Sequence, residues 1–92
     1  MTVALMWEAK AAEGHGHELL TWCREHTLAP APIRRETYAA PGDRVLVITW
    51  WRAAYDADLP ELPDPPAALT ARPVHRWRFE QVQPRDVTPE SP

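Results

Sequence analysis

A chain of 92 residues with one cysteine has room for a single domain and cannot form an internal disulfide. Its formal net charge of −3 argues against general nucleic-acid binding, which needs a basic surface, and no apolar run has the length of a membrane span. We therefore expect a cytoplasmic protein that binds no nucleic acid and no membrane, with one domain over residues 1–83 and a flexible tail over 84–92.

The first half of the chain predicts a strand and then a helix. Strict alternation predicts a strand over Val3–Lys10, with Val3, Leu5, Trp7 and Ala9 on one face. A helix is expected over His17–Leu28, because apolar and aromatic residues recur at helical spacing; they are Leu19, Trp22, Cys23 and His26.

Two strands joined by a tight turn come next. Ile33–Ala40 is a strand of mixed polarity, and Pro41-Gly42-Asp43 fits a type II turn because glycine accepts a positive φ. The strongest strand pattern covers Arg44–Arg52, with Val45, Val47, Thr49 and Trp51 on one face and Leu46, Ile48 and Trp50 on the other.

The last third of the chain is irregular and ends in a strand. Five prolines between Ala53 and Pro73 prevent a continuous helix, leaving room for one helical turn over Pro66–Ala71. Alternation then predicts a final strand over Val74–Val82.

The strand faces predict the order of the sheet. The first and third strands are apolar on both faces, so they belong in the centre, with the mixed strands at the edges. One helix covers only one side of such a sheet. We expect a second copy of the chain to cover the other, because a domain this small cannot readily leave a broad apolar face in water.

Four features resemble the dimeric α/β-barrel superfamily, whose subunits are ferredoxin-like, and within it the group similar to antibiotic-biosynthesis monooxygenases. The features are a short first strand before Gly14, the helix Gly-His-Glu-Leu-Leu-x-Trp over 16–22, the Pro-Gly-Asp hairpin before a strand ending in Trp51, and the final Arg-x-Arg-x-Glu over 76–80. The resemblance covers roughly residues 2–83. It implies an α+β fold of order β-α-β-β-(short or irregular α)-β, with a four-stranded antiparallel sheet, a homodimer, and a pocket between sheet and helices.

The resemblance also frames the functional hypotheses. One is a small-molecule-binding dimer, with a cofactor-independent monooxygenase of a hydrophobic or aromatic compound as its catalytic form. The alternative is a non-catalytic dimeric module that stabilises or regulates a partner protein. The sequence does not decide between them, nor whether the protein is an enzyme. Haem degradation is disfavoured because the related haem-degrading enzymes use an asparagine on the first strand, and this chain has no asparagine.

The aromatic residues at the end of the third strand and on the last strand are the candidate ligand-binding residues. They are Trp50, Trp51, Tyr55, His75 and Trp77. Consecutive strand residues point to opposite faces, so the sequence leaves open which of Trp50 and Trp51 faces a pocket and which an interface. His75 is most simply a partly wet edge residue, because no nucleophile or orienting carboxylate can be placed beside it from the sequence.

The remaining polar clusters favour structural interpretations. His15 and His26 are about 16 Å apart along a helix axis, too far for one metal with Cys23, and we assign no metal, cofactor or catalytic residue. The charged side chains on the second and fourth strands are expected to form cross-strand or intersubunit ion pairs; they are Arg35, Glu36, Arg76, Arg78 and Glu80.

Overall fold

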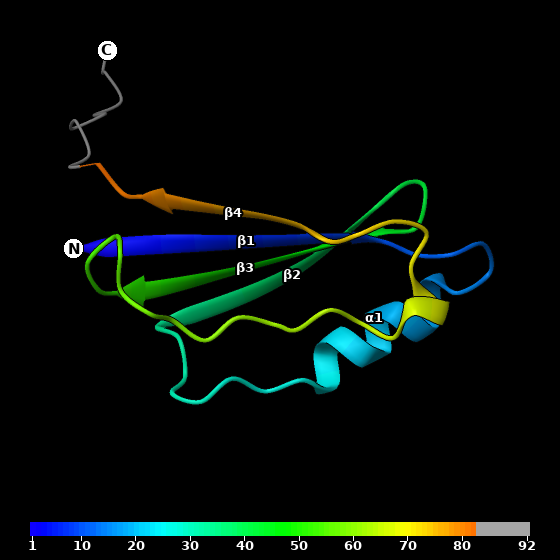
Figure 1. Cartoon of the computed structure of the whole chain (residues 1–92), viewed down its shortest axis with the longest axis horizontal. Coiled ribbons are helices and arrows are strands. Elements are labelled where there is room, and N and C mark those ends of the chain that lie inside the picture. Colours follow the sequence, from blue (N-terminus) through cyan, green and yellow to red (C-terminus); the bar gives the residue numbers. More distant parts are fainter. Residues whose placement is uncertain (83–92) are drawn as a thin grey trace, which may run out of the picture.

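The structure is a computed structural model that describes residues 1–82. Its elements follow in the order β1 (Thr2–Lys10), α1 (Gly16–Glu25), β2 (Arg34–Ala40), β3 (Arg44–Arg52), the single 3₁₀ turn η1 (Ala67–Leu69) and β4 (His75–Glu80). The fold is α+β, as predicted (Figure 1). The predicted tail, 84–92, lies outside the described residues.

The four strands form one antiparallel sheet in the order β2-β3-β1-β4. This confirms that the doubly apolar strands β1 and β3 are central neighbours. It also confirms that the mixed strands β2 and β4 form the edges.

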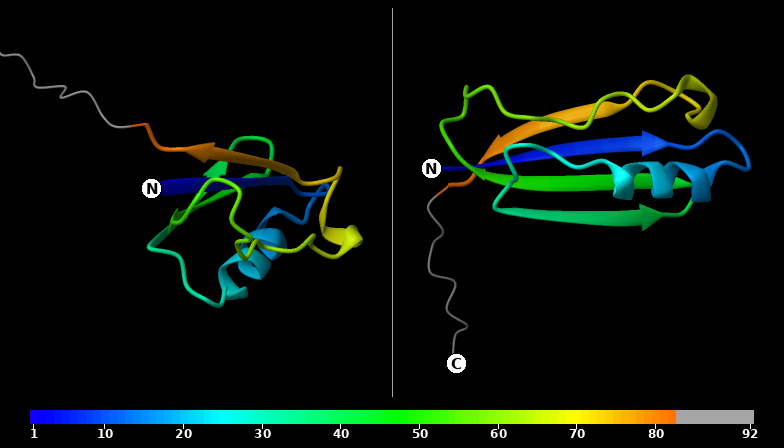
Figure 2. Two further views of the ribbon diagram at one scale, coloured as in Figure 1. Left: turned by 60° about the vertical axis from the view of Figure 1, so that its left-hand side comes forward. Right: turned by 90° about the horizontal axis from the view of Figure 1, so that it is seen from below.

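The helix and the irregular segment lie on one side of the sheet (Figures 1 and 2). The alternate residues of β1 and β3 that point to this side are all buried; they are Val3, Leu5, Trp7, Ala9, Val45, Val47, Thr49 and Trp51. Leu19 and Cys23 of α1 and Leu62 of the irregular segment complete this core. We call this side of the sheet the covered face.

The hairpin between β2 and β3 has the expected glycine and one further residue in the left-handed region. Gly42 has a φ of 82°, as the predicted turn requires. Asp43 follows with a φ of 58°, which aspartate tolerates better than most residues. Because Ala40 pairs with Arg44, the loop between them spans three residues. The Asp43 carbonyl accepts a hydrogen bond from the Ala11 N–H at 2.8 Å, which joins the hairpin to the end of β1.

The helix ends at Glu25, three residues before the predicted end at Leu28. Arg35 of β2 is the physical reason, because its guanidinium donates hydrogen bonds to the carbonyls of Cys23 at 2.6 Å and His26 at 2.5 Å. A side chain distant in sequence thus satisfies carbonyls that further helical turns would otherwise occupy. His26 itself is already extended, with φ −84° and ψ 119°.

Segment 53–74 contains no continuous helix, as its prolines predict. Its helical structure is one 3₁₀ turn over Ala67–Leu69, inside the predicted range 66–71. Backbone hydrogen bonds join the end of this segment to the end of β1, from Ala12 N–H to Leu69 carbonyl and from Ala71 N–H to Lys10 carbonyl. No helix within residues 1–82 has the length and apolar character that crossing a membrane requires.

Candidate functional site: the open face of the sheet

The other side of the sheet is not covered by any element among the described residues (Figure 1). We call it the open face. Strand register arranges its side chains in rows across β2, β3, β1 and β4. The rows are Tyr38–Leu46–Glu8–His75, Glu36–Ile48–Met6–Trp77 and Arg34–Trp50–Ala4–Phe79.

Large apolar side chains occupy the middle of the open face and its β4 edge. Trp77 is 45% exposed and Phe79 is 53% exposed. The central residues are half-buried by their neighbours in the sheet alone; they are Met6, Leu46, Ile48 and Trp50. Such a gathering of aromatic and aliphatic side chains on one face is typical of an interaction surface.

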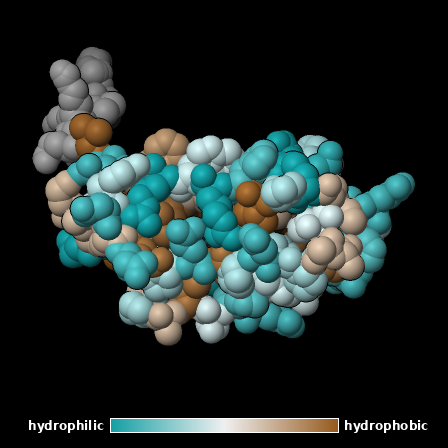
Figure 3. Space-filling model, in the orientation of Figure 1, coloured by the Kyte–Doolittle hydropathy of each residue, from teal (hydrophilic) through white to brown (hydrophobic). Residues whose placement is uncertain are grey.

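The β2 edge of the open face is polar, and its side chains form hydrogen bonds with one another. Glu36 accepts hydrogen bonds from Arg34 and from the Tyr38 hydroxyl. The hydrogen bond from Tyr38, followed by that from Arg34, lowers the pKa of Glu36, and the same bond to the carboxylate raises the pKa of Tyr38. The side of the molecule seen in Figure 3 shows many such hydrophilic residues with apolar ones between them.

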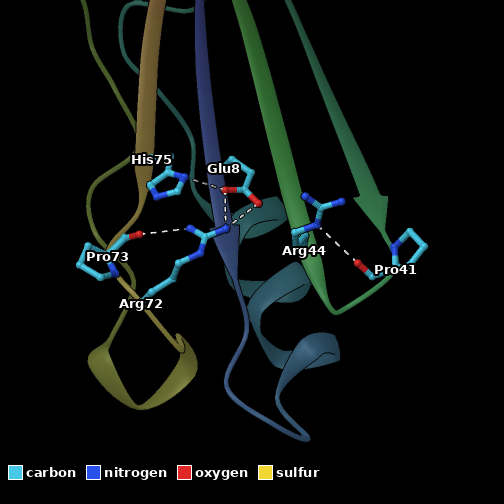
Figure 4. A network of polar contacts seen from close by, with 6 residues as sticks. All are labelled: Glu8, Pro41, Arg44, Arg72, Pro73 and His75. Carbon is cyan, nitrogen blue, oxygen red and sulfur yellow. Dashed lines mark hydrogen bonds and ion pairs between the residues drawn. The ribbon is translucent and has the colours of Figure 1, made fainter.

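One end of the open face carries an ionic cluster centred on Glu8 (Figure 4). Both Glu8 carboxylate oxygens accept hydrogen bonds from Arg72 Nη2, at 2.8 and 2.9 Å. His75 Nδ1 lies 3.5 Å from Glu8 Oε1, which is longer than a good hydrogen bond. Arg44 lies on the other side of Glu8 from these two residues (Figure 4).

A pocket of about 160 Å³ lies at this end of the open face. It is lined by Glu8, Tyr38, Ala39, Ala40, Arg44 and Leu46. Its lining combines apolar groups from β2 and β3 with a carboxylate and a guanidinium. It is therefore the place on the open face where a small molecule would find both an apolar contact and charge.

The interior of the covered face has little room, although a pocket of about 190 Å³ lies between α1 and the end of the β2–β3 hairpin. One space in that interior has a volume of about 10 Å³. It is lined by Leu5, Met6, Trp7, Leu28, Val47, Thr49, Glu61 and Leu62. That volume holds about one water molecule. The buried Trp51 side chain donates a hydrogen bond from Nε1 to Thr49 Oγ1 at 2.8 Å, whereas Nε1 of buried Trp7 has no partner among the described residues.

The structure brings together three of the five residues predicted to bind a ligand. Trp50, His75 and Trp77 share the open face, and the His75 and Trp77 rings meet edge to face with centroids 5.6 Å apart. Trp51 is buried on the covered face, away from these three. Tyr55 lies in the irregular segment, 49% exposed, with its hydroxyl 3.4 Å from the Arg78 carbonyl.

The arginine residues of β4 have a different role from the predicted cross-strand ion pairs. Arg78 donates to the carbonyls of Tyr55 and Ala57, at 2.6 and 2.8 Å. Arg76 donates to the Leu62 carbonyl at 2.7 Å and also contacts the carboxylates of Glu61 and Asp64. These side chains fasten the irregular segment to the sheet, so the prediction of cross-strand pairs for them is wrong.

The other charged residues in that prediction form no cross-strand ion pair within residues 1–82. Arg35 binds the end of α1, and Glu36 binds Arg34 and Tyr38 within its own strand. For Glu80, which stands opposite Val3, no ion pair is formed with the residues that the structure describes.

Sequence reasoning missed the cluster around Glu8. The prediction for His75 assumed that no carboxylate lay nearby, yet the antiparallel pairing of β1 with β4 sets Glu8 directly opposite it. Once β4 is placed beside β1, the register supplies that pairing from the sequence. Arg72 had no such signal, because it lies in a segment without regular structure.

The histidines and the cysteine near α1 do not come together as a site. No group of three His, Cys, Asp or Glu side chains within residues 1–82 is arranged to hold a metal ion. Cys23 is buried, and burial raises the pKa of its thiol to about 11 despite an opposing effect of Arg35, so the thiol is protonated at neutral pH. His26 packs against Trp22, with ring centroids 4.3 Å apart.

Comparison with family models found no match for this chain. Comparisons with curated proteins and with solved structures found none either.

Proposed function

We propose that this protein is a homodimer in which two copies pack open face against open face, as in a dimeric α/β barrel built from ferredoxin-like subunits, and that the dimer binds a small hydrophobic molecule. The observation that carries the proposal is the open face itself. Its apolar residues lie in adjacent rows, with Met6 between Ile48 and Trp77.

The size of the open face suits a second copy. With strands about 4.8 Å apart and about 3.3 Å per residue, its outline covers on the order of 500 Å². Two such faces bury about 1,000 Å² together, which is the least that a stable interface usually needs. A two-fold interface uses the same surface of both copies, and here each copy would contribute its open face.

The small-molecule part of the proposal is supported by the pocket beside Glu8 and Arg44. This pocket has a volume of about 160 Å³. Because it lies on the open face, pairing of two copies would limit its contact with water. A binding site of this kind differs from the one that the family resemblance implies, which lies between the sheet and its helices.

A non-catalytic dimer that stabilises or regulates a partner protein is the second candidate. It is favoured by the small volume, about 10 Å³, of the space between the sheet and the segments around Leu28 and Leu62. Titration of the protein with small ligands separates the two candidates, because the second predicts a dimer that binds none of them.

Sedimentation equilibrium tests the dimer. We expect a particle of twice 10.5 kDa at micromolar concentration. Trp77→Glu should raise the dimer Kd at least about thirtyfold, because it places a charge among buried aromatic contacts at the interface. Tyr55→Glu is the matched control, since Tyr55 is similarly exposed but lies off the open face, and it should leave the mass unchanged.

A single particle of 10.5 kDa at several hundred micromolar would overturn the dimer, and so would a Trp77→Glu protein of unchanged mass. Circular dichroism of both variants checks that they are folded. Should Trp77→Glu fail to fold, Phe79→Glu tests the same edge of the open face, where Phe79 is 53% exposed.

A further inference from the structure

Two cations stand directly opposite each other at the end of the open face. Register pairs Lys10 of β1 with Arg44 of β3, on the same face as Glu8. Like charges at opposing strand positions are destabilising. Neither side chain has a carboxylate within 4.0 Å among residues 1–82.

The Arg44 guanidinium is almost unused by the fold. Its only hydrogen bond within the described chain is from Nε to the Pro41 carbonyl at 3.4 Å, which is long for a hydrogen bond. Its two terminal nitrogens donate none there. A guanidinium presents a planar pair of donors that matches a carboxylate.

The nearby carboxylate does not neutralise this end. Glu8 accepts hydrogen bonds on both oxygens from Arg72, and its side chain is only 12% exposed. Glu8 and Arg72 thus cancel each other, and the positive charges of Lys10 and Arg44 remain. The electrostatics of the pocket favour an anion.

The rest of the pocket is apolar and sized for one ring. Leu46, Ala39 and Ala40 line it, and the Tyr38 hydroxyl is already committed to Glu36. The volume of about 160 Å³ is close to that of an engineered protein cavity of about 150 Å³ that binds benzene.

We propose that this pocket binds a small aromatic or cyclic monocarboxylate, with the ring against Leu46 and the carboxylate held by Arg44 beside Lys10. The inference rests on the proposed function, because pairing of two open faces encloses the pocket and strengthens the ionic contact by excluding water. It adds the chemical class of the ligand and the residue that selects it.

Calorimetric titration of the full-length protein with three probes tests the site. Benzoate supplies ring and charge, benzamide supplies the ring without the charge, and acetate supplies the charge without the ring. We expect benzoate to bind at least about tenfold more tightly than either of the others, because each lacks one of the two contacts.

Arg44→Gln should weaken benzoate binding by about tenfold or more, since it removes a charge-assisted hydrogen bond. Arg52→Gln is the matched control, because Arg52 lies on the same strand and face at the opposite end, and it should leave binding unchanged. Both variants keep a long polar side chain at an exposed position and are expected to fold.

Sedimentation of the same samples separates failure of the ligand site from failure of the dimer. A dimer that gives no heat with benzoate, or that binds benzoate equally well with Arg44→Gln, overturns the ligand inference and leaves the dimer. A monomer that binds no benzoate overturns both. Equal affinity for benzoate and benzamide overturns the role of Arg44 as the group that selects charge.

Discussion

The two faces of the sheet differ far more in their surroundings than in their composition. On β3, Val47 is 1% exposed and Trp51 is 5% exposed on the covered face, whereas Ile48 and Trp50, their immediate neighbours in sequence, are only half-buried on the open face. All four are large and apolar. Apolar character therefore does not tell which face the chain itself covers, and the connections between strands decide it.

Hydrogen bonds as well as apolar packing hold the irregular segment on the covered face. The proline-containing segment cannot form a long helix, and Arg76 and Arg78 instead hold its backbone carbonyls in place. Leu62 reaches the core from that segment. The open face has no such segment among residues 1–82, which is why we assign its cover to a second copy.

Replacement of Trp51 should produce the largest difference between the faces. Trp51→Ala removes a buried ring and its hydrogen bond to Thr49, and we expect a loss of about 3–5 kcal/mol in the free energy of unfolding. Trp50→Ala should lower the free energy of unfolding by clearly less, at a protein concentration where the chain is monomeric. Urea unfolding of both variants measures this, and equal losses would contradict the assignment of faces. Trp51→Phe keeps the comparison available if Trp51→Ala is unfolded.

Most of the sheet could be predicted from the sequence, because period-two alternation is a local signal. Strand β3 was predicted with its observed bounds, Arg44–Arg52, and the faces of β1 and β3 were divided correctly. The central position of those strands followed from their apolar character on both sides. The proline spacing correctly excluded a continuous helix over the irregular segment.

The parts that the sequence did not predict depend on contacts between distant residues. The end of α1 depends on Arg35, twelve residues after Cys23. The candidate site depends on Glu8 and Arg72, which are 64 residues apart in the chain. No local pattern predicts such pairs; for Glu8 and His75, the relevant information is the strand register.

The pH dependence of stability tests how dry the covered side is at Cys23. Burial raises the thiol pKa from an ordinary 9.0 to about 11, so between these values the folded chain keeps a proton that the unfolded chain has lost. Stability should therefore be unaffected by this thiol below pH 9 and fall by roughly 2–3 kcal/mol as the pH rises through 11. The raised pKa of Tyr38 acts in the same direction.

Urea unfolding of the wild type and of Cys23→Ala between pH 8 and 11 isolates the contribution of the thiol. The difference between the two proteins should shrink as the pH rises, because the variant has no thiol to ionise. A difference that stays constant over this range would show that Cys23 is solvated.

The smallest effect is expected for a hydroxyl introduced on the open face. Ile48→Thr keeps a β-branched side chain at a half-buried position, so we expect it to change the free energy of unfolding by less than about 1 kcal/mol in dilute, monomeric protein. Val47→Thr, one residue earlier, buries the same hydroxyl on the covered face and should cost about 1–3 kcal/mol. At concentrations where two copies pair, the cost of Ile48→Thr should grow and that of Val47→Thr should not, because only Ile48 would then become buried. Urea unfolding at two protein concentrations measures both costs, and a cost for Ile48→Thr that does not depend on concentration would contradict the pairing of open faces.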